Sequence, residues 1–373
     1  PDLSGDLFES AWAKLLQRHS GLRVVFNWRD TEVPSQSVVP DMPVDFQHHD
    51  WSDFSADKAE QRLDKLLQQD RQKGFDLENG PCMRFKLVRM PANDYRFIWS
   101  FHHVLIDGRS FGMLLFEVFA IYDELRGVGK AELPDPLPFR NFVGWQQNLN
   151  HDKSLLFWQD FLTGYRLPTI LHLAGAEDIQ TDEGFGSEQL TLPAETTQKL
   201  HALAAHHKVG LSSLLHACWA LLLARYSGNN DVVFGVTRSC PGGTSKNAES
   251  APGIYINTLP ARIDANPAQT IGAWLQAIRQ QQKTITKHEH TPLVDVQRSA
   301  KLPVGQGLFE SIVVYDDKSL VGELREQGGD WLKRDFKLLE RPSFPLALYA
   351  YGDANLLLLD EPTAGMGAED SDR

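Results

Sequence analysis

The sequence is poor in basic charge and in cysteine. Its 373 residues include 37 lysines and arginines against 49 aspartates and glutamates, which gives a formal net charge of −12. Binding of phosphate backbones needs a basic surface, so nucleic acid is not expected as the main partner, although a local basic patch would leave composition unchanged. The three cysteines are far apart and form no Cys/His pattern typical of a metal site, so no metal is expected.

Long apolar runs are also missing. No stretch reaches the roughly 18 apolar residues of a membrane span, and the longest, 214–224, contains a histidine and indicates a buried helix. The sequence starts at Pro1 without a basic or apolar leader, so no signal peptide is predicted. We therefore expect a cytoplasmic protein that does not lie in a membrane, keeps its thiols reduced and begins partway through a longer polypeptide.

The first half of the chain alternates helices and strands. Helical spacing of apolar residues predicts helices over 7–19, over 56–73 and after Gly108, and strands are predicted over 22–26, 82–90 and 95–102. In the strand over 82–90, Met83, Phe85 and Leu87 alternate with Arg84 and Lys86, which predicts one wet face. A proline-rich joint at 133–138 leads into one long helix that ends near residue 164.

A second unit follows a polar segment over 166–187 that has the composition of a linker. Strands are predicted over 188–192, 232–237, 255–263 and 308–315, and helices over 194–207, 212–226 and 270–288. Strands and helices are mixed without a strict βαβ rhythm. The pattern favours two α/β sandwich lobes, an N-terminal lobe over 1–165 and a C-terminal lobe over 188–355.

The segment His102-His103-Val104-Leu105-Ile106-Asp107-Gly108 has the strongest chemical signal in the chain. Two adjacent histidines end a predicted strand, and an aspartate and a glycine follow at a distance that suggests a tight turn. A histidine so placed can act on a substrate while the aspartate fixes the loop. Taken in isolation, the pattern is equally consistent with an ordinary surface loop.

This segment resembles the HHxxxDG signature of the condensation-domain and chloramphenicol-acetyltransferase-like superfamily. Other segments resemble motifs of condensation domains in the family's order: 18–23 (RHSGLR), 75–77 (FDL) with 80–81 (GP), 142–146 (FVGWQ) with 157–158 (FW), 253–262 (GIYINTLPAR), 290–298 (HTPLVDVQR) and 308–311 (LFES). Residues 6–355 as a whole therefore resemble a condensation domain of a nonribosomal peptide synthetase.

The resemblance implies two chloramphenicol-acetyltransferase-like lobes arranged as a V, with a tunnel between them. The tunnel would admit the phosphopantetheine arms of donor and acceptor carrier proteins, which are the implied partners together with neighbouring synthetase domains. The acceptor amine would attack the donor thioester directly, without a covalent acyl-enzyme and without a cofactor bound by this domain. Holding two tethered reactants together would supply much of the rate.

The family's motif gives roles to the residues of the loop. The resemblance implies that His103 lies beside the attacking amine, either as a general base or as an orienting, charge-stabilising group. It implies a structural role for His102, and an ion pair between Asp107 and an arginine, with Arg23 as the first candidate.

The resemblance implies roles for three further residues. Arg262 is the second candidate for the partner of Asp107. Gly108 is expected to let the backbone turn near the tunnel. Asn257 occupies the position of a tunnel-facing asparagine, and the alternative is a strand-end amide that satisfies backbone groups.

Related families fit less well. Epimerisation domains follow the two histidines with a Ser-Trp pair, whereas Ser110-Phe111 stands here. Heterocyclisation domains replace the two histidines with a DxxxxD pattern, whereas His102 and His103 stand here. Two alternatives stay open. One is a standalone acyltransferase for a soluble amine or alcohol, and the other is a catalytically silent docking module for carrier proteins.

Both ends depart from the family pattern. The usual SxxQxRxW-like start is absent, so we expect a domain truncated at both ends. Residues 356–373 (LLLLDEPTAGMGAEDSDR) resemble the Walker B segment of an ABC-transporter ATPase, in which Asp360 would help to hold Mg²⁺ and Glu361 would activate water. The phosphate-binding loop that this chemistry needs is missing from the sequence. We interpret the tail as a non-native junction, in which Leu356–Leu359 could still pair as a strand.

The tail generates the first prediction, that the chain neither hydrolyses nor tightly binds ATP, because half of the nucleotide site is missing from its sequence. Isothermal titration calorimetry with Mg-ATP should give no heat of binding. Micromolar affinity that is lost in Asp360→Asn would contradict this expectation.

Overall fold

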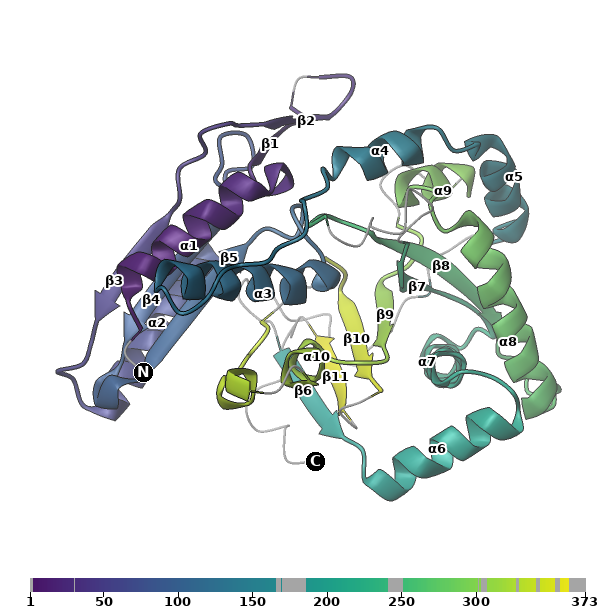
Figure 1. Ribbon diagram of the computed structural model, residues 1–373. Helices are drawn as coiled ribbons and strands as arrows, with labels where there is room; N and C mark the ends of the chain where they lie inside the picture. Colours follow the sequence, from purple (N-terminus) through teal and green to yellow (C-terminus); the bar gives the residue numbers. More distant parts are fainter. Residues whose placement is uncertain are drawn as a thin grey trace. The chain divides into compact units, whose positions relative to one another are not determined.

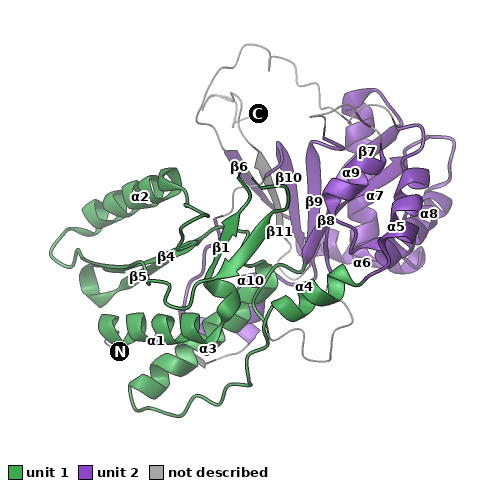
Figure 2. Cartoon of the chain, turned by 90° about the horizontal axis from the view of Figure 1, so that it is seen from above, with its two compact units in different colours: residues 1–148, 241–255 green, residues 149–240, 256–373 purple. Residues whose placement is uncertain are grey.

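The computed structural model describes residues 3–29, 31–165, 169, 186–240, 251–300, 302, 307–326, 329–339, 343–352 and 356–361, of which 329–330 and 356–361 are described by backbone alone. The chain divides into two compact units: unit 1 holds residues 1–148 and 241–255, and unit 2 holds residues 149–240 and 256–373 (Figure 2). The expected lobes, 1–165 and 188–355, differ from this division. Residues 149–165 belong to unit 2 rather than to the first lobe, and residues 241–255 belong to unit 1 rather than to the second. Most of the expected linker over 166–187 lies outside the described residues.

Unit 1 contains a three-stranded sheet of β3 (Phe46–Asp50), β4 (Met83–Arg89) and β5 (Tyr95–Phe101), with β4 in the middle. Helices α1 (Gly5–Arg18) and α3 (Gly108–Leu125) lie side by side (Figure 1). Trp12 of α1 packs on the rings of Phe85 and Phe97, at centroid distances of 4.4 and 5.6 Å. The helices predicted over 7–19 and from Gly108 are confirmed, because their apolar stripes cover this aromatic face. A separate hairpin of β1 (Val24–Asn27) and β2 (Ser35–Val38) completes the strands of unit 1.

The opposite face of the sheet is dry, so the prediction of a wet face in β4 is wrong. Arg84 and Lys86 are only 4% and 5% exposed. Helix α2 (Ala56–Lys73) contributes Asp70, which accepts hydrogen bonds from Arg84 Nε at 2.8 Å and Ser100 Oγ at 2.6 Å and pairs with Lys86. Burial acts to raise the pKa of Asp70, but these bonds lower it to about 2. Alternating charges on a strand signalled burial around a counter-ion here rather than exposure to water.

The single long helix expected after the proline-rich joint is two helices. Helix α4 (Arg140–Gln147) ends at Asn148, and α5 (His151–Phe161) begins after Asn150, whose side-chain oxygen accepts a hydrogen bond from Asp152 N at 3.1 Å. Asparagine favours such caps over helix interiors, which explains the break. The boundary between the two units falls at this break.

Unit 2 contains a six-stranded sheet in the order β6-β11-β10-β9-β7-β8. Its strands are β6 (Gly186–Thr191), β7 (Asp231–Ser239), β8 (Ile256–Asp264), β9 (Ser311–Asp316), β10 (Leu346–Tyr351) and β11 (Leu356–Glu361). The predicted pairing of Leu356–Leu359 is confirmed, because β11 runs antiparallel to both β6 and β10.

Helices cover both faces of this sheet. Phe234 of β7 packs in one buried cluster with residues of α6 (Ala194–His206), α7 (Leu211–Ser227) and α8 (Ile271–Ile285), whereas Val233 packs on the other face with α5 and α9 (Leu293–Ser299). The short helix α10 (Leu320–Glu326) follows β9. None of the described helices alone is long and apolar enough to cross a membrane. Helices α6 and α7, bent by 101° at their break, pass that test only as a pair, by length and composition.

The buried charges of unit 1 generate a stability prediction. Asp70→Asn leaves Arg84 and Lys86 buried beside a neutral amide, and breaking a buried ion pair from one side typically costs about 3–5 kcal/mol. We expect the free energy of unfolding, measured by urea titration, to fall by that amount. Asp64→Asn on the exposed side of the same helix is the control and should change little.

The carboxyl group of Asp70 also makes the free energy of unfolding depend on pH. Because the pKa of Asp70 in the folded protein is about 2, below its ordinary value of 3.8, the stabilisation is complete above that ordinary value and is lost as the pH falls toward 2. The difference in unfolding free energy between wild type and Asp70→Asn should therefore shrink on acidification. A difference that is small at pH 7, or that grows in acid, would contradict the assignment.

Candidate functional site

The HHVLIDG segment forms a tight connection between β5 and α3. His102 N donates to Cys82 O at 2.9 Å, which extends the sheet by one residue, and Leu105 N donates back to His102 O at 3.1 Å. Leu105 and Ile106 are buried and hold the turn on the core of unit 1. Asp107 then caps α3, which begins at Gly108.

The two histidines differ in their surroundings. His102 Nδ1 accepts a hydrogen bond from Val104 N at 3.1 Å, and its ring meets Phe75 edge-on at 6.4 Å. Burial, followed by the neighbouring His103, lowers the pKa of His102 below its ordinary value. Both side chains are exposed, but the ring of His103 makes no hydrogen bond or ion pair within the part of the chain that the structure describes. The first ring is engaged in the loop, whereas the second is available to a ligand.

Phe97, Trp99 and Phe101 precede His103 at alternate positions on β5. These rings do pack inside unit 1; Phe101, for example, meets Phe111 at 5.1 Å. The strand ends at Phe101, however, and the chain turns at His103. The turn takes the ring of His103 out of this row, and the side chain is exposed.

Asp107 is fully buried and binds backbone groups. Its Oδ2 accepts a hydrogen bond from Tyr255 N at 2.6 Å, its Oδ1 accepts one from Arg109 N at 3.2 Å, and its own N donates to Gly253 O at 3.1 Å. Ser110 Oγ adds contacts with Gly253 N at 3.1 Å and Gly253 O at 3.2 Å. The aspartate and serine thus join the loop to residues 253–255, the segment that returns to unit 1 from far along the sequence.

Tyr255 is held on a second side by rings and a cation. The rings of Phe142 and Phe139 lie 4.8 and 5.4 Å from it, and the guanidinium of Arg109 lies 5.8 Å from its centroid. Burial, followed by the charge of Asp107, raises the pKa of the Tyr255 hydroxyl to about 12. The tyrosine therefore stays neutral and acts as an anchor.

Arg23 does not pair with Asp107, so that prediction is wrong. Its guanidinium donates to Leu16 O at 2.8 Å and Gln17 O at 3.3 Å in the last turn of α1, and to Val39 O and Pro40 O at 2.8 and 2.7 Å. Carbonyls at a helix C-terminus lack partners within the helix and attract a cation. Arg23 therefore caps α1 and fixes residues 39–40.

Arg262, the second candidate, binds within unit 2. Its Nε and Nη2 donate to the carboxylate of Asp231 at 2.9 and 2.7 Å, and its Nη1 donates to Phe161 O and Thr163 O at 3.1 and 2.7 Å. Gly108 has no steric need to be glycine, since a Cβ built there would meet nothing within 4 Å and its φ is not positive. The turn instead depends on the Asp107 cap.

Asn257 lies near the start of β8. Its Nδ2 donates to Glu289 O at 2.8 Å and Thr291 O at 2.7 Å, so both amide hydrogens are used on the loop after α8. Arg238, its partner across β7 and β8, reaches the same loop through Glu289 Oε2 at 3.4 Å and Thr286 Oγ1 at 2.5 Å. Burial raises the pKa of Glu289 above its ordinary value despite this arginine.

The sequence interpretation missed the Arg238–Glu289 pair and a second buried group in unit 1. Glu117 of α3 is 5% exposed and binds Arg18 Nε at 2.9 Å and His19 Nε2 at 2.6 Å. A glutamate on the apolar face of a predicted helix was the signal that could have revealed this group. The RHSGLR segment therefore fastens α1 to α3 through its first two residues and caps α1 through its last.

The sequence profile of the condensation domain family matches residues 1–353. The chain belongs to the condensation domain family. This family forms peptide bonds by acyl transfer. Curated relatives of this chain include large synthases. It is 35% identical over 355 residues to a linear gramicidin synthase of Brevibacillus parabrevis, covering 95% of the chain and 7% of that protein. It is 34% identical over 328 residues to chondramide synthase cmdD of Chondromyces crocatus, covering 88% of the chain and 8% of that protein. The condensation domain thus spans less than a tenth of these relatives.

Solved structures confirm the fold. The X-domain from teicoplanin biosynthesis superposes with a TM-score of 0.80 at 18% identity, covering 99% of this chain and 84% of that one. A mutant starter condensation domain of the rhizomide synthetase RzmA gives a TM-score of 0.78 at 19% identity, covering 98% and 83% of the two chains. The predicted family and its chloramphenicol-acetyltransferase-like α/β fold are confirmed.

The contacts of Asp107 generate a prediction. Asp107→Ala leaves the buried N–H of Tyr255 without its acceptor, which typically costs about 1–3 kcal/mol. Hydrogen–deuterium exchange should show faster exchange of the Tyr255 amide, together with a matching loss of unfolding free energy.

Asp123→Ala, at an exposed position late in the same helix, is the matched control for this change. Protection at residue 255 should stay at the wild-type level in the control. Unchanged protection of that amide in Asp107→Ala would show that the carboxylate does not hold the segment.

Proposed function

We propose that this condensation domain joins a donor acyl or peptidyl thioester to an acceptor aminoacyl amine, both carried on phosphopantetheine arms of carrier proteins. The observation that carries the proposal is the geometry of HHVLIDG. An exposed, unengaged His103 projects from a turn whose neighbours His102, Leu105 and Asp107 are all held by hydrogen bonds or burial. A fixed turn with one free imidazole suits a group that must meet a substrate repeatedly in one geometry.

His103 has the chemistry that the reaction requires. The acceptor amine attacks the thioester carbonyl as a neutral nucleophile and must lose a proton as the C–N bond forms and the C–S bond breaks. An imidazole titrates near neutral pH and can accept that proton or stabilise the developing positive charge on nitrogen. The leaving thiolate then takes up a proton, which balances the step without a covalent acyl-enzyme.

Asn257 is the substrate-contacting residue that we propose in unit 2. Because its Nδ2 is already committed to Glu289 O and Thr291 O, only Oδ1 remains to meet a ligand. The side chain is therefore an acceptor, suited to an N–H or O–H of the substrate. The two hydrogen bonds of Nδ2 also fix the direction in which Oδ1 points. Asn257 would then both anchor the loop after α8 and line the substrate tunnel.

Donor and acceptor carrier proteins and neighbouring synthetase domains are the partners that we propose, in keeping with relatives that are many times longer than this chain. The phosphopantetheine belongs to those carriers, so the proposal assigns no cofactor to the domain itself. Two other functions are tested against it. One is acyl transfer to a free amine or alcohol, and the other is carrier docking without chemistry.

A reconstitution separates the three. The domain is supplied with two loaded carrier proteins, and the acceptor carrier is analysed by intact mass spectrometry. Amide on the acceptor carrier supports condensation. Product only on added free amine or alcohol supports the standalone acyltransferase, and carrier binding without turnover supports the docking module.

The reaction generates a prediction for His103→Ala. Loss of a general acid–base group typically costs about 10²–10⁴-fold, so single-turnover amide formation should fall by that factor while carrier affinity and melting temperature stay unchanged. Residual activity should remain, because the carriers still position both reactants.

His102→Ala is the comparison, and it should lower stability more than the rate, since its ring accepts a hydrogen bond from Val104 N. A folded His103→Ala protein with near wild-type turnover at saturating carriers would show that His103 is not the proton acceptor.

A further inference from the structure

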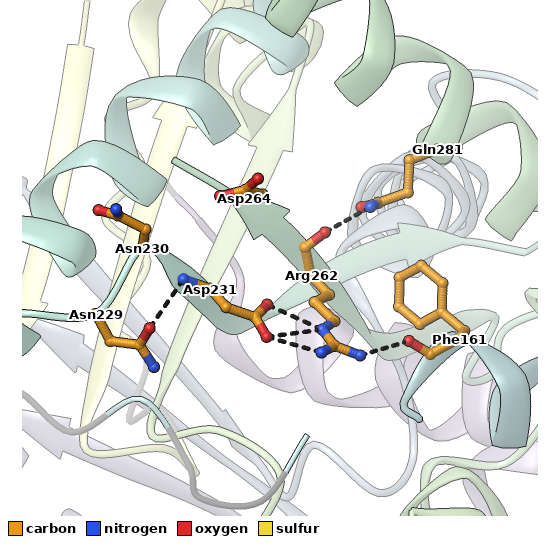
Figure 3. A pocket seen from close by; sticks show the side chains of 7 residues that line it. All are labelled: Phe161, Asn229, Asn230, Asp231, Arg262, Asp264 and Gln281. Atoms are coloured by element: carbon orange, nitrogen blue, oxygen red, sulfur yellow. Dashed lines mark hydrogen bonds and ion pairs between the residues drawn. The ribbon is translucent and has the colours of Figure 1, made fainter. Parts of the chain in front are cut away.

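A cleft lies in unit 2 around Arg262 and its partner Asp231. It has a volume of about 650 Å³ and opens at the end of the sheet where β7 begins and β8 ends (Figure 3). Seven side chains line it: Phe161, Asn229, Asn230, Asp231, Arg262, Asp264 and Gln281. They come from the end of α5, the turn after α7, the two strands and α8, so the cleft is built by five separate elements.

The cleft is remote from Asn257. Asp231 pairs with Asp264 at one end of the β7–β8 ladder, and Arg238 pairs with Asn257 seven residues further along. At roughly 3.4 Å per residue the two ends are about 24 Å apart. The cleft therefore lies away from Asn257, the substrate-contacting residue that we propose in unit 2.

Arg262, the cation that lines the cleft, already binds other groups of unit 2. Arg262 donates from Nε and Nη2 to Asp231 and from Nη1 to the carbonyls of Phe161 and Thr163, and Figure 3 shows it between Asp231 and the Phe161 ring. Gln281 Nε2 donates to Arg262 O at 2.5 Å, which orients the amide. An anion would have to displace Asp231 from a bidentate pair, so the cleft does not favour one.

The groups that remain available accept hydrogen bonds or carry negative charge. Asp264 is exposed, and in the described part of the chain its carboxylate meets no cation, only Asn266 N and Gln269 Nε2. Within the described residues, Gln281 Oε1 accepts no hydrogen bond and only its Nε2 is used. The lining thus has one more negative than positive charge, beside the face of Phe161.

We infer that this cleft is a binding site for an organic cation, an alkylammonium or guanidinium group on an apolar stem. The charged end would pair with Asp264 and donate to Gln281 Oε1 and the amide of Asn230, while the stem packs on Phe161. A cation near an aromatic face gains further attraction. Both a free polyamine and the side chain of a lysine or arginine in a polypeptide have this chemistry.

The test uses the whole 373-residue chain and NMR titration with cadaverine and agmatine. Saturable shifts of the Gln281 and Asn230 side-chain amide signals are expected, whereas 1,5-pentanediol, with the same stem and no charge, should cause none. N-acetyl-lysine methylamide tests the polypeptide source. Tighter binding of this compound than of cadaverine assigns the site to a peptide side chain, and weaker binding assigns it to a free polyamine.

Two variants decide whether the cation binds where we infer. Asp264→Asn keeps the oxygen that accepts from Asn266 N but removes the charge, and should weaken cadaverine binding about two- to fivefold, the range of exposed ion pairs. Asp152→Asn, exposed on α5, is the control and should bind as wild type. Equal binding of pentanediol, equal affinity in Asp264→Asn, or shifts confined to other residues would overturn the proposal. Amide formation in the reconstitution should be unaffected by Asp264→Asn, which separates this site from the proposed function.

Discussion

A carboxylate that is fully removed from water must be surrounded by hydrogen-bond donors, and Asp107 meets this requirement with a backbone N–H that lies 148 positions away. The backbone amides of Tyr255 and Arg109 donate to it. One side chain therefore both caps α3 and binds the segment at 253–255, which is distant in the sequence. The turn that presents His103 is thereby fixed at both sides. The position of the candidate catalytic residue depends on a residue that need not touch the substrate.

The same constraint recurs in unit 1. Asp70 neutralises Arg84 and Lys86 under α2, and Glu117 binds Arg18 and His19 between α1 and α3. Asp70 joins α2 to β4, the next element of the chain, whereas Glu117 joins α3 to the end of α1, 98 positions away. Such pairs add little net stability compared with well-packed apolar residues, but removal of one partner is strongly destabilising because it leaves a buried charge unpaired.

The sequence allowed the family, the fold and the main helices and strands to be predicted, because motif spacing and apolar periodicity are local signals. Polar contacts were predicted less well. Arg23 was expected to pair with Asp107, yet it binds the backbone carbonyls at the end of α1. Every residue has a backbone carbonyl, so the sequence does not show which carbonyls lack a partner. Arg84 and Lys86 were expected in water because alternation shows which residues share a face but not what covers that face.

The chain passes between the two units at three points, after residues 148, 240 and 255, and this has a consequence for domain recombination. Suppose that the first 148 residues are exchanged for those of a relative. The aspartate of the new loop would then meet the segment 253–255 of the original protein, which belongs with a different loop. A working chimaera should therefore exchange residues 241–255 together with the amino-terminal part. The segment to be exchanged is therefore discontinuous in the sequence, as unit 1 itself is.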